Sequence, residues 1–141
     1  MFERVYLVWD IYDGERSGLA DYCGSPHYFE CVLDYEKGGY TDVFEIRPIG
    51  ADLLQLALEQ WAIYRRWEKM FHLGEVPLTT HPGHSGQSSR YDELEKEIEA
   101  QLQSLPGPSA KVTGEFRLVE GQPELPAGCL REVEVAWTRA T

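Results

Sequence analysis

The sequence lacks the features that direct a chain to an oxidising compartment or into a membrane. Its cysteines, Cys23, Cys31 and Cys129, are odd in number, and none has the CxxC spacing of a redox or zinc motif. The longest unbroken hydrophobic run near the N-terminus is 5–9, which is too short for a signal peptide or a membrane span. We therefore expect reduced thiols, a cytoplasmic location and no membrane association.

Basic residues are also scarce. Thirteen Lys and Arg stand against 24 Asp and Glu, which gives a net charge of −11. This charge repels phosphate backbones and anionic lipids, so it argues against a nucleic-acid binder. The glycine-rich patterns GxGxxG and GxxxxGK[ST] that cradle phosphates are absent from the sequence, and we expect no cofactor.

Apolar residues are plentiful enough to build a core. Hydrophobic residues make up 43% of the 141 residues and aromatic residues 12%. A chain of this length and composition fits one globular domain, which we expect to span 1–141. Polar stretches rich in proline and glycine at 76–88 and 121–128 predict two flexible loops.

The first fifty residues are typical of a β-meander. Short apolar stretches separated by turn residues predict strands over 5–12, 18–23, 27–33 and 42–48. A two-residue turn after the second strand pairs position 23 with position 26, which sets the two faces of the hairpin. The core face would carry Ala20, Tyr22, Phe29, Cys31 and Leu33, and the opposite face Asp21, Tyr28 and Glu30.

Two helices and a hairpin are expected to follow. The first helix should run from Asp52, an N-cap completed by Gln55, to about position 73, with Gly74 ending it. Its apolar and aromatic positions cover a wide arc, which predicts packing on more than one side. The second should start near Ser89, whose spacing to Asp92 fits a capping box. The segments 111–120 and 129–138 then predict a closing hairpin.

Strands grouped before and after the helices predict an α+β fold. We expect an antiparallel sheet, made of the four-strand meander and the C-terminal hairpin, with both helices packed on one face.

Three carboxylates of the meander are candidate catalytic residues. Asp10 interrupts an otherwise apolar strand, so its side chain needs a partner, for which Arg4, Arg16 or Arg47 qualifies. Asp21 and Glu30 share one face of the predicted hairpin, where paired carboxylates suit acid and base catalysis or a divalent cation. The alternative is that they form an ordinary acidic surface.

Histidines suggest one metal-binding hypothesis. His81 and His84 lie three residues apart on the loop after the first helix, and His72 near the helix end is the nearest third ligand in sequence. The alternative is a polar loop with solvated imidazoles.

The aromatic and acidic residues favour protein binding. Tyr28 and Tyr40 are the tyrosines expected at the surface, and Glu93 and Glu97 belong to the acidic second helix. We therefore expect a non-catalytic module, of the immunity or adaptor type, that binds a basic protein partner. The alternative is a small metal-dependent or acid/base hydrolase using the carboxylates or the histidine loop. Self-association through the aromatic first helix is compatible with both.

Overall fold

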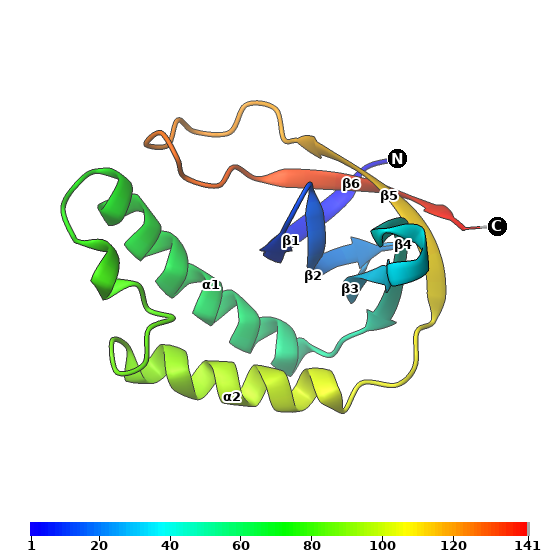
Figure 1. The fold of residues 1–141 in the computed structure, drawn as a ribbon, viewed down its shortest axis with the longest axis horizontal. Coiled ribbons are helices and arrows are strands. Elements are labelled where there is room, and N and C mark those ends of the chain that lie inside the picture. Colours follow the sequence, from blue (N-terminus) through cyan, green and yellow to red (C-terminus); the bar gives the residue numbers. More distant parts are fainter. Residues whose placement is uncertain (141) are drawn as a thin grey trace. The chain divides into compact units, whose positions relative to one another are not determined.

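The computed structural model describes residues 1–140 and divides the chain into two compact units. The barrel unit comprises Met1–Gly50, Leu105–Glu120 and Glu132–Thr141, and the helical unit comprises Ala51–Ser104 and Gly121–Arg131. Each unit has its own secondary structure, shown in Figure 1. That the chain behaves as a single domain stays a prediction.

The barrel unit contains six strands in one antiparallel sheet. Each strand pairs with the next in sequence order, and β1 also pairs with β6, which closes the sheet into a barrel. The α+β class and the antiparallel sheet are therefore confirmed, whereas the closure of that sheet into a barrel was not predicted. The strands are β1 (Glu3–Ile11), β2 (Glu15–Tyr22), β3 (Ser25–Asp34), β4 (Gly39–Pro48), β5 (Ala110–Leu118) and β6 (Val133–Arg139).

Closure depends on contacts that no local pattern encodes. Glu3 pairs with Val135 and Arg4 with Glu134, so the first strand of the chain meets the last. Interior side chains alternate with exterior ones in open sheets and barrels alike, so alternation does not reveal which edges join.

An aromatic cluster fills the barrel interior. Phe29, Phe44, Phe116 and Trp137 lie with ring centroids 5.7–5.9 Å apart. These large rings fit because two strands carry glycine opposite them. Gly18 on β2 pairs with Phe29, and Gly114 on β5 pairs with Trp137.

The turn between β2 and β3 differs from the predicted one by one position on each strand. Cys23 and Gly24 are its two central residues, with φ of 52° and 81°, and Tyr22 pairs with Ser25. Positive φ at both positions defines the type I′ turn that suits the twist of a hairpin. The pairing of β2 with β3 is displaced by two residues from the predicted register. A displacement by an even number leaves each side chain on the same face of the sheet, so both faces keep their predicted members. Leu33, a member of the predicted core face, is nevertheless 44% exposed.

The helical unit contains α1 (Ala51–His72), the single 3-10 turn η2 (Leu78–Thr80) and α2 (Ser89–Gln103). Helix α1 begins one residue before the predicted cap, so Asp52 lies in its first turn. Gly74 follows α1 with φ of 77°, as expected for the residue that ends a helix. Helix α2 is capped by Ser88 rather than Ser89, because the Ser88 hydroxyl accepts a bond from the Tyr91 amide.

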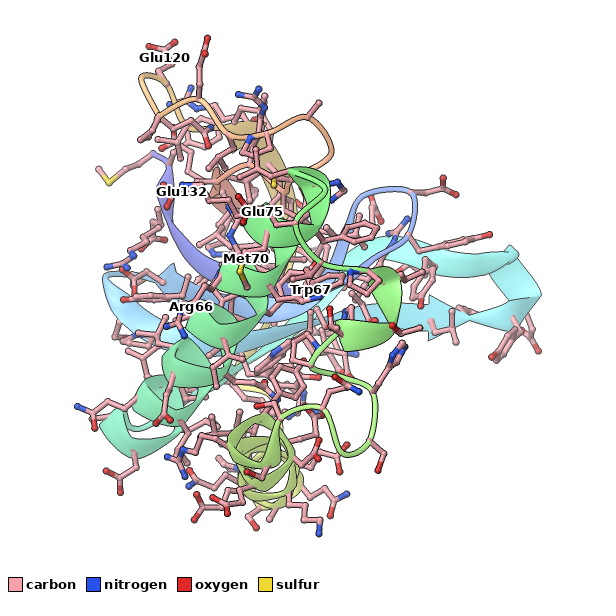
Figure 2. All side chains as sticks on the ribbon, turned by 90° about the vertical axis from the view of Figure 1, so that its left-hand side faces the viewer. Arg66, Trp67, Met70, Glu75, Glu120 and Glu132 are labelled. Atoms are coloured by element: carbon pink, nitrogen blue, oxygen red, sulfur yellow. The ribbon has the colours of Figure 1, made fainter. Side chains whose placement is uncertain are left out.

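Helix α1 packs on more than one side within its unit, as predicted. The carboxylate of Glu59 accepts a hydrogen bond from the guanidinium of Arg90 on α2. The indole N–H of Trp67 donates to the Thr80 hydroxyl at 2.9 Å. Figure 2 shows the Trp67 side chain on the flank of α1 nearest the 75–88 segment and Arg66 on the other flank. On a further side, the Glu68 carboxylate accepts from the amide of Leu130 at 2.9 Å.

Across residues 1–140, neither helix combines the length and the apolar character needed to cross a membrane.

Candidate functional site

One end of the barrel gathers two chain reversals. Adjacent strands run in opposite directions, so the β1–β2 turn and the β3–β4 connection emerge at the same end. The rings of Tyr12 and Tyr40, one from each reversal, have centroids 6.1 Å apart. We call this end the mouth and define it as residues 11–16 and 33–42.

Local sequence determines the shape of the mouth. Asp13 and Gly14 form the β1–β2 turn with φ of 52° and 109°, a region that Asp and Gly tolerate best. In the β3–β4 connection, Asp34 caps the short turn η1 (Tyr35–Lys37) by accepting from the Glu36 amide. Both reversals therefore follow from turn residues visible in the sequence. In Figure 2 the β3–β4 connection, drawn in cyan, projects from the sheet.

Exposed apolar side chains concentrate at the mouth. Nine large hydrophobic residues are exposed in the part of the chain that the structure describes, and five of them belong to the mouth. Single exposed apolar residues are normal on protein surfaces, but a group of them marks an interaction site. The five are Ile11, Tyr12, Leu33, Tyr35 and Tyr40.

A pocket of about 480 Å³ opens at the mouth. Its lining includes the interior rings Phe44 and Phe116, and Tyr40 also contributes to it. Ligand pockets commonly measure 300 to roughly 1,000 Å³, so this volume is large enough for a side chain or small molecule.

Arg16 is the only cation in the pocket lining. Its guanidinium lies over the Tyr40 ring, 4.6 Å from the centroid, and donates to the carbonyl oxygens of Tyr12 and Asp13. A third contact joins Nη1 to the Cys31 sulfur at 3.6 Å. Among residues 1–140, no ion pair within 4.0 Å involves Arg16, so its charge is held by carbonyl dipoles and an aromatic face.

Three carboxylates line the same pocket: Asp13, Glu15 and Asp42. No side-chain hydrogen bond or ion pair within the described chain engages any of them. With Arg16 as the one cation, the formal charge of the lining is −2. The pocket therefore favours a positively charged group.

The predicted catalytic carboxylates divide between two places. Asp10 and Glu30 flank Ser17 on neighbouring strands, and the Ser17 hydroxyl donates to Asp10 at 3.3 Å. Asp21 lies toward the opposite end of β2 and accepts from the Tyr6 hydroxyl at 2.8 Å. The three side chains therefore do not converge, and Asp10 is exposed rather than covered within its strand.

The two predicted binding tyrosines differ in environment. Tyr40 is 43% exposed at the mouth. Tyr28 is half-buried on the barrel wall and donates to Glu30 at 3.0 Å. Burial, and then the charge of Glu30, raise the pKa of Tyr28 well above its usual 10, so its hydroxyl stays a donor.

Glu93 and Glu97 are exposed on α2. Glu93 pairs with Arg90 at 3.3 Å, and Arg90 also binds Glu59 on α1. Part of the acidic charge of α2 is thus engaged within the helical unit.

The histidines form an aromatic contact rather than a ligand set. His81 lies against Trp67, 4.5 Å between ring centroids, and 5.6 Å from His84. The amide of Gly83 donates to His81 Nδ1. Burial, and then His84, lower the pKa of His81. Across the described chain, no three His, Cys, Asp or Glu side chains stand close enough to hold a metal, and His72 lies beside Gly128 instead.

Two residues matter more than the sequence suggested. Arg16, predicted as one possible partner for Asp10, instead lines the pocket, and it is the sole Lys or Arg between positions 4 and 37. Glu68 on α1 is 2% exposed and binds Arg65 and the Leu130 amide. No sequence signal distinguishes Glu68 from other helical acids.

Comparison of the chain with protein families, with curated proteins and with solved structures found no match.

Proposed function

We propose that this protein is a non-catalytic module that binds a basic protein partner, and that the mouth of the barrel is its binding surface. The observation that carries the proposal is the coincidence of exposed aromatic side chains with carboxylates that have no partner. Tyrosines are common at protein interfaces because one rigid ring buries a large area and keeps a polar group.

Charge supports the same surface. The mouth carries five acids and two bases, and the whole chain has a net charge of −11. A field of this sign speeds the capture of a basic protein and disfavours acidic ones. The face of α2 is also acidic, but none of the exposed large hydrophobic side chains of residues 1–140 lies on α2.

The test measures binding of a peptide in which arginine alternates with glycine, by calorimetry on the full chain. Wild-type protein should bind it, and the affinity should fall at least about tenfold when the salt rises from about 50 mM to about 500 mM, because exposed charges are then screened. An affinity that does not change with the salt concentration, or no binding at low salt, would contradict the proposal.

Matched variants locate the surface. D13N/E15Q/D42N removes three charges from the mouth, and Asn at position 13 keeps the positive φ of the turn. We expect about tenfold weaker binding, since each exposed ion pair contributes about 0.2–1 kcal/mol. E93Q/E97Q/E99Q removes the same charge from α2 and should change the affinity less than twofold. The reverse ranking would place the binding surface on α2.

A further inference from the structure

The mouth pocket already holds one guanidinium group, which belongs to the protein itself. Arg16 of the chain itself lies on the Tyr40 ring, with its Nε and Nη2 on two carbonyl oxygens. The walls thus already accommodate a guanidinium without a carboxylate. The pocket carboxylates, Glu15 and Asp42 among them, remain available for a second cation.

Several other acids of the barrel unit already have partners within the fold. Glu3 accepts from the amides of Cys23 and Gly24, and Asp21 accepts from Tyr6. Glu45 lies 3.9 Å from Arg47. The acids of the pocket have no such role in the fold, so a ligand does not have to compete for them.

We propose that the pocket receives an arginine side chain of the partner, which serves as the anchor of the interface. The inference rests on the proposed function and specifies its chemistry. Arginine suits these walls better than lysine, because its planar group stacks on aromatic faces and is more weakly hydrated, and its donors bind a carboxylate in two places. The like charge of Arg16 weakens the attraction but leaves the lining at −2.

The probes are three blocked tripeptides that differ in one residue: acetyl-Gly-Arg-Gly-amide, its lysine counterpart, and its citrulline counterpart. Citrulline has the shape of arginine without the charge. Titration of ¹⁵N-labelled full-length protein at low salt, followed by NMR, detects the weak binding expected of one side chain. Arginine should shift the amides of Gly14, Thr41 and Gly114 around the pocket and bind about threefold tighter than lysine. Citrulline should produce no shifts.

Three variants separate the contribution of the aromatic walls to binding from that of the charges. Tyr40→Leu should abolish the preference for arginine over lysine while lysine still binds, whereas Tyr35→Leu should keep it, because Tyr35 is exposed at the mouth but is not part of the lining. Asp42→Asn should weaken both cations about equally. If Tyr40→Leu disturbs the fold, which widespread changes of the amide signals would show, Asp42→Asn and the citrulline tripeptide test whether the cation binds in the pocket.

The outcomes distinguish this inference from the proposed function. Equal binding of the arginine and lysine tripeptides, or arginine shifts confined to α2, overturns the arginine pocket. If the tripeptides do not bind while the longer arginine-glycine peptide binds at the mouth, the proposed function stands and the pocket is not its anchor. If neither binds, both are wrong.

Discussion

At the scale of single residues, Gly18 shows how closely the barrel is packed. A Cβ at this position would lie 2.2 Å from the carbonyl oxygen of Leu7 and 2.9 Å from the Phe29 ring. Gly18→Ala should therefore cost at least about 2 kcal/mol, because the backbone of β1 must move. Urea unfolding measures the loss. The control is Gly50→Ala, where a Cβ meets nothing within 4 Å; equal costs for the two variants would argue against the observed packing.

Glu68 fastens the 121–131 segment to α1. The side chain is 2% exposed, and it binds the Arg65 guanidinium and the Leu130 amide. Glu68→Gln should lower the free energy of unfolding by about 1.5–3 kcal/mol, the range for hydrogen bonds to charged groups, and should speed amide exchange at Leu130. Glu75→Gln, at an exposed position after α1, is the control and should change neither quantity.

His81 predicts a dependence on pH. Because its pKa is lowered in the folded state, folding favours the neutral ring. The stabilisation is complete above the unfolded pKa of about 6.5 and is lost as the pH falls below that value toward the folded pKa. His81→Gln removes the titrating group, so the melting temperature should fall less between about pH 7.5 and 5.5 in the variant than in the wild type. An equal fall in both proteins would assign the pH dependence to other groups.

At the scale of elements, the start of α2 separates two serines that the sequence does not distinguish. Ser88→Ala should cost about 1 kcal/mol, because the hydroxyl of Ser88 accepts from the Tyr91 amide at 3.1 Å. Ser89→Ala should be neutral or slightly stabilising, since Ser89 is already inside the helix and alanine has the higher helix propensity. Thermal unfolding of the two variants measures both costs. A larger loss of stability for Ser89→Ala than for Ser88→Ala would show that Ser89 is the cap, as the sequence predicts.

Element boundaries were predictable where turn chemistry was explicit. Asp13 and Gly14 form the first turn and Gly74 follows α1, and the positive φ at these positions favours few residue types. The start of β6 was placed at position 129 but lies at Val133. Residues 129–131 belong instead to the helical unit, where Leu130 binds Glu68, a contact between distant parts of the chain.

At the scale of the whole molecule, barrel closure is the feature to test. Arg4 and Glu134 pair across β1 and β6, and paired residues in antiparallel strands are close enough for a disulfide. In a C23S background, R4C/E134C should oxidise to an intramolecular disulfide and raise the melting temperature. Mass spectrometry with and without reductant detects it. R4C/T138C, whose second position pairs with β5 instead, should not form the bond, and if both variants crosslink equally the observed register is wrong.

The candidate site combines predictable and unpredictable parts. Tyr40 was expected at the surface and is 43% exposed there. The pocket was not foreseen, since Arg16, Asp42 and Phe116 come from three strands that only the barrel brings together. Asp21 and Glu30 share one face of the hairpin, as predicted, but Glu30 pairs with Ser17 and Asp21 with Pro26, so the two carboxylates lie toward different ends of β2.

By itself, the sequence determined the strands, the helices, most turns and the excess of acidic charge, because these depend on residues close together in the chain. Periodicity and turn chemistry act over a few positions, and charge is additive. The tertiary structure alone decided that the sheet closes, that aromatic rings meet opposite glycines, and that three carboxylates without partners surround one arginine. Those features arise from pairs of residues far apart in the chain, which become neighbours only when the strands are assembled.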